Sequence, residues 1–68
     1  MSQLFRYVPW HKLHTGDTIV GYRKKLRLIE MMPTKVDYIT PSYLELSNGT
    51  SLFNTGEYSF KVRYEKEE

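Results

Sequence analysis

A hairpin pattern followed by a strictly alternating segment constrains the fold of this chain most. Residues 43–53 place two short runs of apolar side chains on either side of Asn48-Gly49, a pair that favours a tight β-turn. From Tyr58 to Tyr64, aromatic and aliphatic residues occupy every second position. This spacing is typical of an antiparallel strand that buries one face. The pattern therefore predicts a β-domain.

The apolar residues of the hairpin also predict its register. A two-residue loop at Asn48-Gly49 would place Phe53 beside Leu44. A three-residue loop over 47–49, with Gly49 in the left-handed conformation, places Leu52 beside Leu44 instead. The second arrangement gives the hairpin one consistent apolar face, so we predict the three-residue loop.

Further strands are predicted where β-branched and aromatic residues gather, at 3–8, 17–22 and 35–40. Segment 22–32 fits two structures. Its composition and the spacing of its apolar residues favour a helix, but it has no capping residue at its entry and no glycine at its exit. We favour a turn near Lys24-Lys25, then a strand that Pro33 ends.

The chain is long enough for a single domain of five or six short strands. We expect an all-β fold over residues 1–64, either a small antiparallel barrel or two packed sheets, with residues 65–68 as a frayed charged tail. The alternative is an α+β fold with a helix at about 22–32. Without cysteine, the core depends on six Tyr, three Phe and one Trp. We leave open that the chain forms a homo-oligomer, because self-association is one way to stabilise so small a domain.

The layout is similar to that of SH3-like small barrels. A Gly16-Asp17 turn enters a strand, a basic loop follows, and a Leu-x-Leu-x-Asn-Gly hairpin starting at Leu44 precedes the closing strand. The resemblance covers about residues 13–64 and concerns the fold alone. It implies a module that binds peptides or nucleic acids and does not catalyse a reaction. The chain lacks the acidic loop with clustered aromatics that the peptide-binding members use.

Charge is divided unevenly along the chain. Residues 1–35 carry seven Lys and Arg against two acids, a balance of +5, and residues 36–68 carry three against six, a balance of −3. The densest basic cluster has two aromatic neighbours that could stack on bases. The sequence thus predicts a nucleic-acid site at Arg23, Lys24, Lys25 and Arg27 with Tyr22 and Trp10, supported by Arg6, Lys12 and Lys35; ordinary solvation of the same cations is the alternative.

A second hypothesis uses the excess of apolar side chains. One small barrel cannot bury both faces of its hairpin, and Tyr43, Phe53 and Met31 are of the types enriched at protein interfaces. The protein would then inhibit or adapt a larger partner. Burial of both faces in one core is the alternative.

No pattern in the chain supports catalysis or a cofactor. The carboxylates are scattered, and no glycine-rich phosphate loop is present. His11 and His14, with Asp17 nearby, make too small a ligand set for a metal, so we expect ordinary loop histidines and no metal or cofactor.

No apolar run is long enough for a signal peptide or a membrane span. We expect a cytoplasmic protein with no membrane partner, and a chain that is a complete small gene product. In its small size and its lack of cysteine the chain resembles the small host-directed proteins of bacteriophages, but it shares no motif with them.

Overall fold

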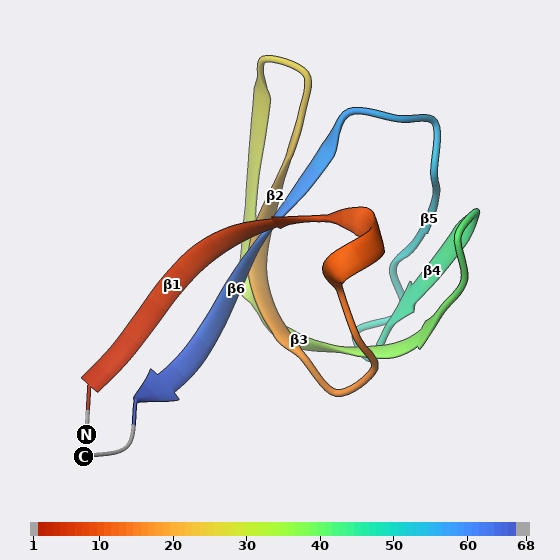
Figure 1. The fold of residues 1–68 in the computed structure, drawn as a ribbon. Helices are drawn as coiled ribbons and strands as arrows, with labels where there is room; N and C mark the ends of the chain where they lie inside the picture. The colour runs from red at the N-terminus through yellow and green to blue at the C-terminus, as the bar shows by residue number, and fades with distance from the viewer. Residues whose placement is uncertain (1, 67–68) are drawn as a thin grey trace.

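Residues 2–66 form six antiparallel strands in the computed structural model, which describes these residues and the side chains of residues 4–64 (Figure 1). The strands are β1 (Ser2–Pro9), β2 (Thr18–Lys24), β3 (Arg27–Ile39), β4 (Tyr43–Leu46), β5 (Ser51–Phe53) and β6 (Tyr58–Lys66). A 3-10 turn, η1 (Trp10–Lys12), follows β1. Residues 2–66 contain no α-helix, so the all-β prediction is confirmed and the alternative helix at 22–32 is wrong.

The strands join in one curled sheet in the order β1-β6-β2-β3-β4-β5. The sheet is open, with β1 and β5 at its two edges, so the closed barrel that the sequence suggests does not form. The curl comes from β3, which pairs with β2 up to Lys35 and with β4 from Val36 onward. Figure 1 shows β3 bending between these two partners, so that β4 and β5 turn back toward the other strands.

The uninterrupted β3 corrects the prediction that Pro33 ends a strand. Between Gly21 and Ile19 of β2 the ladder skips from Glu30 to Thr34 of β3, which leaves residues 31–33 outside the regular pairs. A proline at such an irregularity costs no ladder hydrogen bond, because its missing N–H has no partner to lose. Pro33 therefore lies within the bend of β3.

The β4–β5 hairpin has the predicted three-residue loop. Leu44 pairs with Leu52, and Gly49 adopts a positive φ of 92°. The Gly49 N–H donates to the Leu46 carbonyl at 3.0 Å, and the Leu46 N–H donates to the Thr50 carbonyl at 2.8 Å. The apolar face that the sequence favoured is therefore the face that packs into the core.

The core lies inside the curl of the sheet. It contains Trp10, Leu13, Ile19, Val36, Leu44, Leu46, Phe60 and Val62. The alternation predicted for β6 is observed, because Phe60 and Val62 are buried while Lys61 between them points to the other face.

The first and last strands are neighbours in the sheet, and Ser2 of β1 pairs with Lys66 of β6. The strand therefore includes the first two residues of the predicted tail 65–68, and residues 67–68 lie outside the described residues. Within residues 2–66, no helix is long and apolar enough to cross a membrane.

Candidate binding surfaces

The basic segment at the β2–β3 hairpin does not form one surface. Successive strand residues point to opposite faces, so Arg23 lies on the face away from the core while Lys24 and its cross-strand partner Arg27 lie on the other. The Lys24 ammonium donates to Thr55 Oγ1 at 2.6 Å and to the Gly56 carbonyl. Lys24 is thus used to hold the β5–β6 connection.

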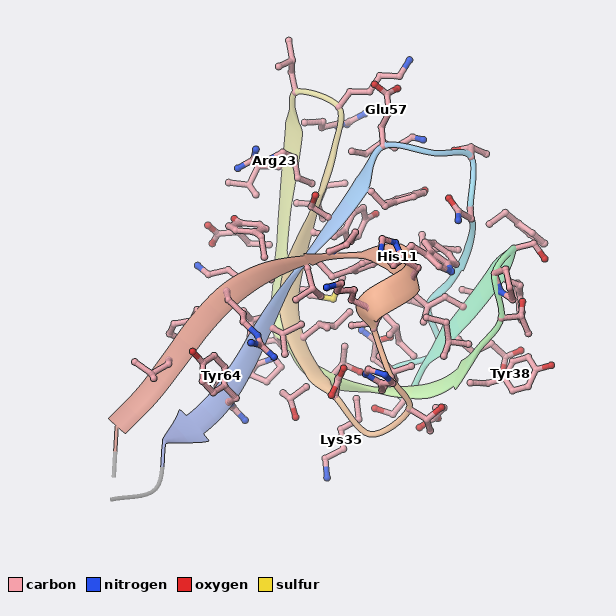
Figure 2. All side chains as sticks on the ribbon, viewed as in Figure 1. His11, Arg23, Lys35, Tyr38, Glu57 and Tyr64 are labelled. Carbon is pink, nitrogen blue, oxygen red and sulfur yellow. The ribbon has the colours of Figure 1, made fainter. Side chains whose placement is uncertain are left out.

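Lys25 lies at the tip of the hairpin and is also engaged. Its backbone adopts a positive φ of 55°, its N–H donates to the Glu57 carbonyl at 3.3 Å, and its Nζ lies 3.8 Å from Glu57 Oε2. Both side chains are well exposed, so this pair contributes little stability. Figure 2 shows Glu57 and Arg23 near this upper end of the molecule. The four predicted cations are therefore close in sequence but divided between two faces and a tip.

The two predicted stacking residues are turned inward, which corrects their assignment. Trp10 is only 6% exposed, and its indole N–H donates to the Thr40 carbonyl at 2.7 Å. Its ring contacts Tyr58 and Phe60, with centroids 5.4 and 5.6 Å away. Tyr22 is half-buried against the same two rings. In a chain with so small a core, these rings are needed for packing.

A different aromatic and cationic surface lies on the outer face of β1, β6 and β2, the face that points away from the core. Phe5 and Tyr7 alternate along β1 and are 49% and 42% exposed. The register places Arg63 opposite Phe5 and Lys61 opposite Tyr7. Arg23 of β2 reaches the same face. We call these five residues the aromatic platform.

The cations of the platform lie over its rings. The Lys61 ammonium is 5.0 Å from the centre of the Phe5 ring, and the Arg23 guanidinium is 5.0 Å from the centre of the Tyr7 ring. Such cation–π contacts at exposed sites are worth about 0.5–1 kcal/mol each. The sequence carried a signal for this surface in the alternation of Phe5 and Tyr7, but the partners on β6 emerge only from the register.

A basic groove lies between the β1–β6 pair and the segment from His11 to Thr18, mainly on the core side of the sheet. Its volume is about 680 Å³, and Arg6, His11, Lys12, His14, Arg63 and Tyr64 are among the residues that line it. Arg6 lies over the Tyr64 ring, 5.0 Å from its centre. Figure 2 shows Tyr64 on β6 and His11 on η1 at the two sides of this region. Arg6 and Lys12, which the sequence analysis gives only as support for the basic cluster at 23–27, both line this groove.

The two histidines of the groove have different environments. The backbone N–H of His14 donates to Asp17 Oδ2 at 2.9 Å, and the ring atom Nδ1 of His14 lies 4.0 Å from the same oxygen. His11 is exposed on η1. Within the described residues, no group of three or more His, Asp or Glu side chains is arranged to hold a metal.

A second aromatic cluster covers the outer side of β3, β4 and β5. The Tyr43 ring lies between those of Tyr38 and Phe53, with centroid distances of 6.3 and 5.2 Å. Phe53 is 69% exposed and Tyr38 53%. The Tyr43 hydroxyl donates to the Glu45 carboxylate, and this hydrogen bond raises the pKa of Tyr43 above its ordinary value. We call Tyr38, Tyr43, Glu45 and Phe53 the acidic aromatic patch.

The third residue predicted for a protein interface does not join this patch. Met31 is half-buried and packs against the core, whereas its neighbour Met32 is 82% exposed. The difference follows from strand alternation, which turns one methionine inward and the next outward. Met31 therefore serves packing.

Comparison with known proteins gives no match to a family model, to a curated protein or to a solved structure. Function is therefore inferred from the chain's own surfaces.

Proposed function

We propose that this protein is a non-enzymatic binding protein that holds single-stranded nucleic acid on the aromatic platform. The observation that carries the proposal is the exposure of Phe5 and Tyr7 among three cations on one sheet face. Proteins that bind single strands combine aromatic rings, on which bases stack, with cations that contact the phosphates. The platform supplies both on one face of the sheet.

The cation–π pairs suggest how the surface would change on binding. Lys61 and Arg23 lie over the rings in the free protein. A base that stacks on a ring takes the place of the cation, and the flexible cation then reaches a phosphate. The exchange loses a weak exposed contact and gains stacking of about 1–3 kcal/mol per base together with a phosphate contact.

Fluorescence anisotropy with a labelled oligothymidylate across a salt series tests this proposal. We expect Phe5→Ala and Tyr7→Ala each to weaken binding by about 5- to 150-fold, the loss of one stacked base. Phe53→Ala is the matched control, because it removes an exposed ring on another face. Lys61→Ala should reduce the slope of log K against log salt by about 0.7, the value for one phosphate on a single strand.

Arg27→Ala distinguishes binding at the platform from binding at the basic cluster of residues 23–27 that the sequence favours. Arg27 is exposed but lies on the opposite face from Arg23, so its loss should leave the salt slope unchanged. The proposal fails if Arg27→Ala lowers the slope and Lys61→Ala does not, or if the Phe5 and Phe53 variants lose affinity equally.

A second candidate function is protein binding through the acidic aromatic patch. It is favoured by the exposure of Phe53 and Tyr38 beside the carboxylate of Glu45, which suits a partner surface rich in Arg or Lys. In this role the protein would act as a small inhibitor or adaptor in the cytoplasm, of the host-directed type that bacteriophages encode. A pull-down from nuclease-treated lysate tests it: a partner captured by the native protein should be lost with Phe53→Ala and kept with Phe5→Ala. Loss of the partner after nuclease treatment would contradict it.

A further inference from the structure

The basic groove is separate from the aromatic platform, because it lies on the other side of the β1–β6 pair. Arg6 pairs across the strands with Val62, a core residue, and so shares its face. Phe5 and Tyr7, on either side of Arg6, point outward. The groove is therefore a second concavity, and the one residue it shares with the platform is Arg63, which also lines it.

The charges around the groove favour an anion. Arg6 and Lys12 are exposed, and neither forms an ion pair within residues 4–64. The nearby carboxylate of Asp17 already accepts a hydrogen bond from the His14 backbone. His11 and His14 also line the groove and add ring N–H donors, so cations and donors outnumber the one acid that lines it, Asp17.

The size and the remaining walls of the groove indicate more than a bare ion. At about 680 Å³ it falls in the range of small-molecule sites, and Val8, Val62 and the Tyr64 ring supply apolar surface beside the cations. A guanidinium binds phosphate oxygens in a two-pronged geometry, and an ammonium adds a point charge. An organic group attached to the phosphate would lie against the apolar wall.

We propose that the basic groove binds a phosphate monoester of about nucleotide size, with Arg6 and Lys12 on the phosphate and Tyr64 beside the organic group. The phosphate could belong to a free nucleotide or to the 5′ end of a nucleic-acid strand. Both sources present the same terminal phosphate to the groove. The inference does not depend on the platform, because none of the residues it assigns to the ligand belongs to that surface.

Titration of the 15N-labelled protein, followed by amide chemical shifts, tests the inference. With AMP we expect saturable shifts at Arg6, Lys12 and Tyr64, and binding at least about tenfold weaker with adenosine, which lacks the charged group. A 5′-phosphorylated oligothymidylate and its unphosphorylated form distinguish the two sources. Tighter binding of AMP assigns the site to a free nucleotide, and a preference for the phosphorylated oligonucleotide assigns it to a strand end.

Single substitutions test the residues assigned to the phosphate. Lys12→Ala and Arg6→Ala should each weaken AMP binding by about tenfold, whereas Arg27→Ala removes the same charge from a remote exposed site and should have no effect. The spectra themselves report whether each variant is folded. Absence of saturable shifts at Lys12 and Tyr64 with both AMP and the 5′-phosphorylated oligonucleotide would overturn the inference. So would equal shifts with AMP and adenosine, or equal losses in Lys12→Ala and Arg27→Ala.

Discussion

Replacing Trp10 tests whether this ring belongs to the core or to a ligand-binding surface. Its indole N–H donates to the Thr40 carbonyl, and its ring contacts Tyr58 and Phe60. Removing such a buried ring costs about 3–5 kcal/mol. A domain of 68 residues has a total free energy of unfolding of about 3–10 kcal/mol. Trp10→Ala should therefore remove a large share of the stability, and at the low end it should unfold the protein.

Trp10→Phe divides this effect into its parts. The phenyl ring keeps most of the apolar burial but cannot donate a hydrogen bond. The Thr40 carbonyl is then left with the long contact from the Tyr43 N–H at 3.4 Å. We expect a loss of about 1–2 kcal/mol, which is the value of one hydrogen bond with a partly unsatisfied acceptor.

Urea unfolding followed by far-ultraviolet circular dichroism measures both variants, since the backbone supplies most of this signal. Oligonucleotide binding by folded Trp10→Phe provides the second measurement and should equal that of the native protein. A loss of stability below about 1 kcal/mol in Trp10→Ala would refute the packing argument. Lost oligonucleotide binding with unchanged stability would restore Trp10 as a stacking residue.

Three further predictions concern single sites. Gly21→Ala should destabilise the protein by about 1–3 kcal/mol in urea unfolding, because the added Cβ would lie 2.7 Å from the Ile29 carbonyl oxygen on the next strand; an unchanged midpoint would contradict this close approach. Gly49→Val should cost about 1–3 kcal/mol through its positive φ alone, since no atom beyond the adjacent residues lies within 4 Å of the new Cβ. Gly49→Asn should cost less. Glu45→Gln should lower the pKa of Tyr43 toward its ordinary value, which the ultraviolet absorbance of the phenolate measures. In the native protein, the stability that the raised pKa of Tyr43 contributes is complete below about pH 10. This stability is lost as the pH rises through the folded-state pKa.

The parts of the fold that depend on local chemistry could be predicted from the sequence. The Gly49 loop and the pairing of Leu44 with Leu52 follow from turn preference and from one apolar face. The prediction that Pro33 ends a strand is wrong, because a proline ends a strand only where its partner strand needs an N–H. That depends on the skip in register opposite Val20, which no local pattern reveals.

The candidate sites were harder to predict for a related reason. Charged residues that are close along a strand need not form one charged surface, because the side chains of successive residues point to opposite faces. Arg23 and Lys24 therefore lie on different faces of the sheet. The two aromatic neighbours of the basic cluster, Trp10 and Tyr22, are used for packing instead. A small chain without cysteine has to bury some of its large rings, and these two pack in or against the core.

The edge strand β1 connects the two proposed sites. Its outward residues Phe5 and Tyr7 belong to the platform, whereas Arg6 and Val8 between and beyond them line the groove. As an edge strand, β1 pairs only with β6, so this one ladder fixes the geometry of both surfaces. A slip of one residue would exchange the two sets of side chains. It follows that substitutions on alternate positions of β1 should affect one kind of ligand each, and that weakening the β1–β6 ladder should reduce binding at both surfaces together.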